Sequence, residues 1–185
     1  MDPRERLIEE LRRHALVIGE VTLSSGRTAQ YYVDAKRAIL LPPGFSALAA
    51  LVAARARDLR ATAVGGLTMG ADAPACAALA GGAEVKAFFV RKDVKQHGLQ
   101  RRVEGPLLDP AGERCLIVED VVTTGGSTLQ AIEAVRAEGH EVVGVVAVLD
   151  RLAGGAEAIR AAIAPAPYEP LATIDDVHPD RPDRT

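Results

Sequence analysis

Apolar residues change their spacing several times along the chain, and each spacing predicts a different kind of element. Behind Asp2 and Pro3, a pair typical of a helix start, apolar residues recur at helical intervals at Leu7, Ile8, Leu11, Ala15 and Leu16. Short apolar stretches at 21–23 and 31–33 then flank a Ser-Ser-Gly-Arg turn and predict two strands. Residues 1–41 are therefore expected to form a small N-terminal hood, less regular than the rest of the chain.

From residue 42 onward, helical and strand patterns alternate. Helices are predicted at 43–59, 71–80, 126–138 and 154–163, and strands at 62–66, 85–90, 114–119, 141–149 and 167–172. The stretches 114–119 and 141–149 are almost continuously apolar, as is typical of parallel strands covered by helices on both faces. We therefore predict an α/β fold with a central, mainly parallel sheet flanked by helices, a core at 42–172 and a loose tail at 178–185.

Length and composition favour one domain that binds a small molecule. The chain has 185 residues, about the size of a single domain, and its formal net charge of -3 provides no broad basic surface for nucleic acid. No apolar run is long enough for a membrane span, and residues 1–13 are too charged for a secretory signal, so a cytoplasmic location is expected. Cys76 and Cys115 lie in apolar stretches and are predicted to be buried, reduced thiols.

The most informative stretch follows the predicted strand 114–119. Glu119 and Asp120 stand at the carboxyl end of that strand, where open α/β sheets bind ligands, and residues 121–127 form a glycine-rich turn into the next helix. The turn lacks the lysine of a Walker A loop, but free N–H groups at the helix start would hold a phosphate. A phosphorylated sugar would explain both features, since its hydroxyl groups can donate to the two carboxylates. The alternative is that Thr123 or Ser127 only caps the helix and that the acidic pair faces water.

Residues 118–127 read VEDVVTTGGS and closely resemble the phosphoribosyl-pyrophosphate (PRPP) signature of the type I phosphoribosyltransferases. The resemblance implies a type I phosphoribosyltransferase-like fold in which the turn holds the 5-phosphate of PRPP and the acidic pair binds the ribose hydroxyls. The PRPP-binding residues implied in this stretch are Glu119, Asp120, Val121, Val122, Thr123, Thr124, Gly125, Gly126 and Ser127.

A basic insert at 91–104 interrupts the alternation of strands and helices. It is rich in Lys and Arg and has no sustained apolar period. Such an insert is either a functional lid or a solvated basic surface loop. As a lid it would bring cations to a departing pyrophosphate and exclude water from the reacting ribose.

The insert narrows the resemblance to one family. Its R-K-x-x-K-x-H-G pattern resembles the mobile loop of the orotate phosphoribosyltransferases, residues 22–34 resemble their entry segment, and residues 65–72 resemble their pyrophosphate loop. The resemblance implies that Mg2+ is carried mainly by PRPP rather than by a protein site, and that the enzyme is a homodimer whose 91–104 loop serves the neighbouring subunit. Further PRPP contacts are implied for Arg91, Lys92, Lys95 and His97, with Lys95 and Asp120 as the catalytic residues. Ser24 and Met69 stand where many members carry lysine.

Arg151 follows the predicted strand 141–149 and should lie at the same sheet edge as the acidic pair. A guanidinium group there could bind the carboxylate of orotate through two hydrogen bonds, or could form a surface ion pair with Asp150. The family resemblance favours orotate and adds Thr123 as a second contact. Tyr31 and Tyr32 are predicted either to close this pocket or to belong to the core of the hood.

Together these patterns predict a member of the orotate phosphoribosyltransferase family, glycosyltransferases that condense PRPP with orotate to give orotidine 5'-monophosphate and pyrophosphate on the way to UMP. Two alternatives stay open. A purine phosphoribosyltransferase would share the PRPP site but not the basic loop pattern or Arg151. A PRPP-sensing regulator would bind nucleic acid, which the negative net charge disfavours.

Overall fold

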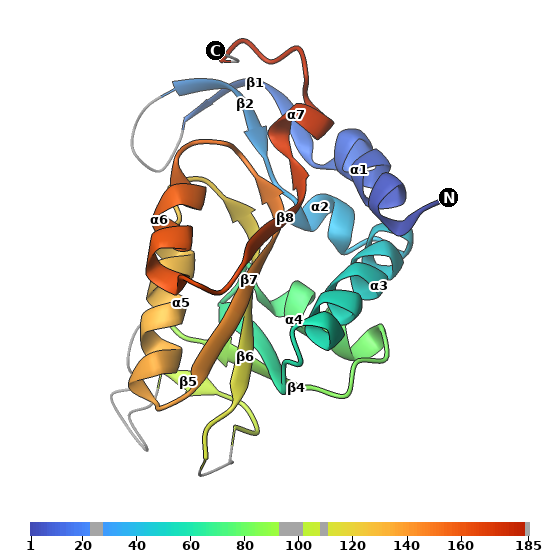
Figure 1. Cartoon of the computed structure of the whole chain (residues 1–185). Coiled ribbons are helices and arrows are strands. Elements are labelled where there is room, and N and C mark those ends of the chain that lie inside the picture. The colour runs from blue at the N-terminus through green and yellow to red at the C-terminus, as the bar shows by residue number, and fades with distance from the viewer. Residues whose placement is uncertain (23–27, 93–101, 108–110, 184–185) are drawn as a thin grey trace.

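The computed structural model describes residues 1–22, 28–92, 102–107 and 111–183, and a six-stranded sheet lies at its centre (Figure 1). The strand order is β5-β4-β3-β6-β7-β8; β4, β3, β6, β7 and β8 run parallel to one another, and the short β5 runs antiparallel to β4. The mainly parallel sheet predicted from the continuous apolar runs is confirmed. The strands are β3 (Ala63–Leu67), β4 (Lys86–Val90), β5 (Val103–Glu104), β6 (Arg114–Val122), β7 (Glu141–Asp150) and β8 (Tyr168–Thr173).

Helices cover both faces of this sheet. On one side lie α5 (Gly126–Ala137) and α6 (Gly155–Ile163), and on the other lie α1 (Pro3–His14), α3 (Pro42–Asp58) and α4 (Asp72–Ala80) (Figure 1). Successive residues of β6 alternate between two cores, with Leu116 and Val118 in one and Cys115 and Ile117 in the other. Because side chains of a strand point to alternate faces and both faces are covered, the central strands are apolar throughout.

The N-terminal segment adds a hairpin near the carboxyl ends of the parallel strands. β1 (Leu16–Thr22) pairs antiparallel with β2 (Thr28–Val33), and the short α2 (Lys36–Ile39) follows. The predicted cap at Asp2 is confirmed, since its side chain accepts hydrogen bonds from the N–H groups of Arg4 and Glu5. α7 (Ile174–Val177) follows β8, and the chain then returns to the hairpin, where Asp183 accepts a hydrogen bond from Tyr31. The division into hood, core and tail stays a prediction.

Three sequence-based expectations need correction. The first helix ends at His14, so Leu16 begins a strand instead of continuing the helix. β6 extends beyond the predicted end at 119 because Val121 and Val122 pair with β7, which places the acidic pair inside the strand. Cys76 is exposed on α4, whereas Cys115 is buried as expected. Within the described ranges, no helix has the length and apolar character needed to cross a membrane.

Candidate active site

Glu119 and Asp120 are buried in β6, with exposed fractions of 4% and 7%. Glu119 Oε2 accepts a hydrogen bond from the Thr128 hydroxyl at 3.4 Å, and Asp120 Oδ2 accepts one from Lys36 Nζ at 2.8 Å. Burial, together with the charge of the adjacent Asp120, raises the pKa of Glu119 to about 8. The interpretation that these acids merely face water is wrong.

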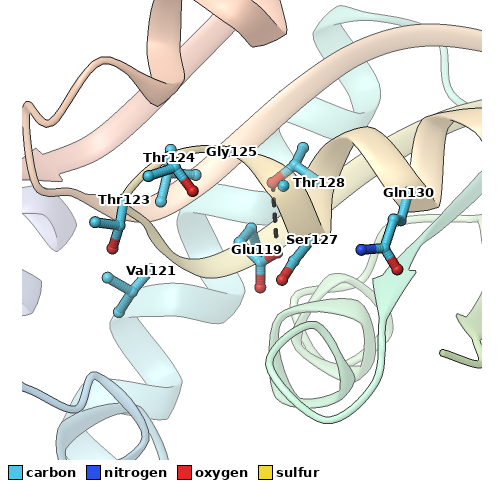
Figure 2. Close-up of a pocket in the computed structure, with 10 residues that line it drawn as sticks. Glu119, Val121, Thr123, Thr124, Gly125, Ser127, Thr128 and Gln130 are labelled. Carbon is cyan, nitrogen blue, oxygen red and sulfur yellow. Dashed lines mark hydrogen bonds between the residues drawn. The ribbon is translucent and has the colours of Figure 1, made fainter. Parts of the chain in front are cut away.

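The turn after β6 presents the start of α5 to a cavity of about 320 Å³, which is lined by residues 121–128 with Glu119 and Gln130 (Figure 2). Gly125 is the N-cap and has a φ of 82°, which glycine adopts without strain. No side chain caps α5, so the interpretation that Thr123 or Ser127 is a helix cap is also wrong. A Cβ built on Gly126 would meet no described atom within 4 Å. The first N–H groups of α5 are thus available to a ligand that approaches the backbone closely.

A second cavity, of about 520 Å³, adjoins the first and shares Glu119, Val121, Thr123 and Ser127 with it. Its wall combines segments that are far apart in the sequence: the end of the hairpin with α2, the loop after β3, Lys92 after β4, and the loop after β7. The predicted site residues that line it are Glu119, Asp120, Val121, Thr123, Ser127, Tyr32, Lys92 and Arg151.

The basic insert is only partly described. Its two ends are joined, since the N–H group of Arg91 donates to the Arg102 carbonyl at 2.8 Å and β5 pairs with β4. The side chain of Arg91 pairs with Glu104 at 3.7 Å, outside both cavity walls, whereas Lys92 faces the second cavity. Lys95, His97 and Ser24 lie outside the described residues.

The loop after β3 touches the acidic pair. A Cβ built on Gly70 would lie 2.4 Å from Asp120 Oδ1 and 2.6 Å from Glu119 Oε1. Glycine is therefore required at this position, because any larger residue would displace the carboxylates. The loop and the acidic pair form one continuous wall of the second cavity.

Arg151 is held against the hood. Its guanidinium carbon lies 5.0 Å from the ring centroid of Tyr31, in a cation–π contact. The two tyrosines are placed differently: Tyr32 lines the cavity, whereas Tyr31 is buried behind Arg151. The alternative ion pair between Arg151 and Asp150 is wrong, since Asp150 is buried and accepts a hydrogen bond from Tyr168 at 2.7 Å. Arg151 Nε is buried and has no hydrogen-bond partner among the described residues.

Known proteins share this sequence and this architecture. The family model of the phosphoribosyl transferase domain matches residues 47–162. The orotate phosphoribosyltransferase of Corynebacterium glutamicum (strain R) is 45% identical over 178 residues, which cover 96% of this chain and 95% of the relative. That of Streptomyces avermitilis is 50% identical over 164 residues, which cover 86% of this chain and 89% of the relative. The chain belongs to the orotate phosphoribosyltransferase family.

Solved structures agree with this membership. Mycobacterium tuberculosis H37Rv orotate phosphoribosyltransferase in complex with PRPP is 40% identical with a TM-score of 0.79, and 96% of this chain and 99% of that chain are covered. Adenine phosphoribosyltransferase from Leishmania donovani, at 18% identity, still reaches a TM-score of 0.71 over 97% of this chain and 86% of that chain, which shows a common fold alone. The predicted family, type I fold and enzyme class are confirmed, and the sequence similarity rather than the fold separates this chain from purine enzymes.

Two contributors to this orotate phosphoribosyltransferase site were not predicted. Lys36 donates a hydrogen bond to Asp120, 84 positions away in the sequence, and Asp183 accepts one from Tyr31, 152 positions away. The charged Asp34 and Lys36, directly after an apolar strand, were a signal that could have drawn attention to this segment. Nothing in the local sequence connects Asp183 to the site.

Proposed function

We propose that the two adjoining cavities bind PRPP and orotate and carry out the family reaction, the transfer of the 5-phosphoribosyl group to orotate that yields orotidine 5'-monophosphate and pyrophosphate on the way to UMP. One observation carries the assignment of the site: the uncapped start of α5 and the buried Glu119 line one cavity, which adjoins a second that contains the buried Asp120 and Arg151. A phosphate, a pair of ribose hydroxyls and a carboxylate-bearing base each have a chemically matching partner there.

In this proposal the 5-phosphate of PRPP binds at the start of α5. The helix dipole and the uncapped N–H groups favour an anion, and the hydroxyl groups of Thr123, Thr124 and Ser127 add donors around the same cavity. The ribose hydroxyls donate to Glu119 and Asp120. Burial makes these hydrogen bonds stronger than they would be in water.

The chemistry needs positioning and charge stabilisation but no covalent nucleophile. The bond from ribose C1 to pyrophosphate breaks, the bond from C1 to N1 of orotate forms, and the N1 proton is released. Asp120 stabilises the positive charge that develops on the ribosyl group. Lys92 faces the cavity on the side of the leaving group, and we assign the main stabilisation of departing pyrophosphate to Lys95, with Arg91 and His97 as further contacts.

The base binds in the second cavity, where Arg151 grips the carboxylate of orotate. The planar guanidinium group suits a bidentate contact, and its Nε is a buried donor without a described partner. Thr123 and Tyr32 complete the pocket wall. Tyr31 acts through Arg151 instead of touching the base, because it lies behind the guanidinium group.

Mg2+ enters the site with PRPP in this proposal. The described part of the chain contains no cluster of three or more His, Cys, Asp or Glu that could hold a metal by itself. The residues present do fit an ion shared with a substrate: Asp72 Oδ1 is a buried carboxylate oxygen without a described hydrogen-bond partner, at the loop whose Thr68 lines the cavity. Mg2+ prefers such oxygen ligands together with substrate phosphates, and it would neutralise charge on the leaving pyrophosphate.

We also propose a cytoplasmic homodimer in which the 91–104 loop of one subunit serves the neighbouring site. A mixing experiment tests the loop exchange. Two inactive variants, Lys95→Ala and Arg151→Gln, should regain part of their activity when mixed, because some dimers then contain one site with both residues intact. Mixtures that stay inactive, in a sample shown to exchange subunits, would indicate that each loop serves its own site.

The decisive experiment for the reaction follows the loss of orotate absorbance with purified protein, PRPP and Mg2+. Consumption should require both PRPP and Mg2+, should fall steeply in Lys95→Ala, and should be insensitive to adenine or hypoxanthine as competitors. Protein that binds PRPP in calorimetry but never consumes orotate would refute the proposal and favour a purine substrate or a regulatory role.

A further inference from the structure

Lys36 lies between two carboxylates at the edge of the second cavity. Its Nζ donates to Asp120 Oδ2 at 2.8 Å and lies 3.1 Å from Asp34 Oδ1. Burial lowers the pKa of Lys36, but the hydrogen bonds to Asp120 and Asp34 outweigh it, and the pKa lies above its ordinary value. Lys36 is therefore a permanent cation in the site, and the mechanism above gives it no role.

The position of Lys36 connects it to the loop after β3. Lys36 contacts one oxygen of the Asp120 carboxylate, and the other oxygen lies 2.4 Å from where a Cβ on Gly70 would be. Lys36 and this loop thus flank the same carboxylate. Both also line the second cavity, together with Lys92. An anionic group bound along the loop lies within reach of the lysine side chain.

Binding of a ribose changes the partners of Lys36. Asp120 Oδ1 already accepts a hydrogen bond from the Val121 N–H group at 2.8 Å, so a ribose hydroxyl competes with Lys36 for Oδ2. The lysine stem is flexible and its side chain is 38% exposed, so it can turn away from Asp120. A released ammonium group would find its strongest partner in the nearest polyanion.

We propose that Lys36 binds the pyrophosphate group of PRPP: Asp120 and Asp34 hold it in the free protein, and it moves to a pyrophosphate oxygen when the ribose engages Asp120. This inference rests on the proposed function and deepens it. It adds to the leaving-group site a cation that comes from the hood side of the cavity, independent of the basic insert. It also explains why a carboxylate can lie beside a polyanionic substrate, since the charge of Asp120 is compensated until the ribose arrives.

The test compares Lys36→Met, which removes the charge at similar length, with Lys36→Arg, which keeps it. Exposed Arg37 is the next residue of α2, and Arg37→Met is the matched control for loss of one positive charge from this helix. Calorimetry on the full chain measures two probes: PRPP with Mg2+, which carries both the ribose and the pyrophosphate, and ribose 5-phosphate, which offers hydroxyls to Asp120 but no pyrophosphate.

Lys36→Met should weaken PRPP binding by about tenfold or more, the effect of losing one charge-assisted hydrogen bond. Ribose 5-phosphate binding should change by less than about threefold, or tighten because its competitor for Asp120 is gone. Lys36→Arg should restore most of the PRPP affinity, and Arg37→Met should change the affinity for neither probe appreciably. Should Lys36→Met not fold, Lys36→Gln takes its place, with thermal melting as the check.

Unchanged PRPP binding in the folded variant would overturn the inference. Equal weakening of both probes would overturn it as well, since Lys36 would then only hold Asp120 in position. The proposed function fails separately: wild-type protein that binds PRPP without consuming orotate refutes the reaction, whereas active wild-type protein with an unaffected Lys36→Met variant refutes only the role of Lys36.

Discussion

Arg151 lies over the ring of Tyr31, with its guanidinium carbon 5.0 Å from the ring centroid. Tyr31 is fixed in turn by a hydrogen bond to Asp183 at 3.0 Å and by an edge-to-face contact with His178. The hairpin, the loop after β7 and the end of the chain thus set the direction of one guanidinium group. Direction matters because a bidentate contact with a carboxylate requires the two groups to be coplanar.

Replacing Tyr31 should therefore weaken orotate binding without a direct contact being lost. Tyr31→Leu should raise the KM for orotate about fivefold, in line with loss of a cation–π contact of about 1 kcal/mol, while the KM for PRPP changes little. Tyr31→Phe keeps the ring and should bind orotate nearly as the wild type does. Steady-state kinetics with each substrate varied in turn provide the measurement, and equal effects of Leu and Phe would contradict the positioning role of the ring.

Replacing Arg151 itself should weaken the reaction with orotate much more than replacing Tyr31. Arg151→Gln should lower kcat/KM for orotate about 100-fold, because two charge-assisted hydrogen bonds of about 1.5 kcal/mol each are lost. Arg151→Lys should keep the charge but lose the bidentate geometry, so its kcat/KM for orotate should lie between those of the wild type and Arg151→Gln. Arg160→Gln is the matched control, since Arg160 also lies over a tyrosine ring, at 5.1 Å from the centroid of Tyr168, but lines neither cavity. A loss in Arg160→Gln as large as that in Arg151→Gln would show that the effect is not specific to the base pocket.

Replacing each of two glycines of the site by alanine should have different effects on stability and on PRPP binding. Gly70→Ala would place a methyl group 2.4 Å from Asp120 Oδ1, so both the melting temperature and PRPP binding should drop. Gly126→Ala meets no described atom within 4 Å, so the free protein should melt at nearly the same temperature. Its KM for PRPP should nevertheless rise several-fold, because the added methyl group would lie where a phosphate approaches the α5 backbone. Thermal melting with and without PRPP separates the two effects, and a Gly126→Ala variant with normal PRPP binding would place the phosphate elsewhere.

The buried Glu119 should make stability depend on pH. Its pKa is raised from 4.5 to about 8 in the folded protein, first by burial and then by Asp120. Between these values the folded state binds more protons than the unfolded state, so the free energy of unfolding falls as pH rises. The contribution is complete below pH 4.5 and is lost as pH passes about 8. Urea titrations should show a slope of up to about 1.4 kcal/mol per pH unit that is absent in Glu119→Gln. Identical slopes in both proteins would refute the raised pKa.

The sequence by itself determined the architecture and the contiguity of the acidic pair with the glycine turn that we propose binds phosphate. Continuous apolar runs such as 114–119 and 141–149 predict parallel strands between two helical layers, because such strands are buried on both faces. The acidic pair and the glycine turn are contiguous, so their order along ten residues of chain already implies their proximity in space. Arg151 was placed correctly because carboxyl ends of parallel strands meet at one edge.

Only the tertiary structure decided the burial and the partners of these residues. Pairing of Val121 and Val122 with β7 extends the strand, and Glu119 is buried inside it. Local sequence propensity does not encode this burial. Lys36 meets Asp120, and Asp183 meets Tyr31, through folding of the hood and of the chain end onto the sheet. Such long-range contacts depend on how separate elements pack, and a pattern read along the chain reports only the elements themselves.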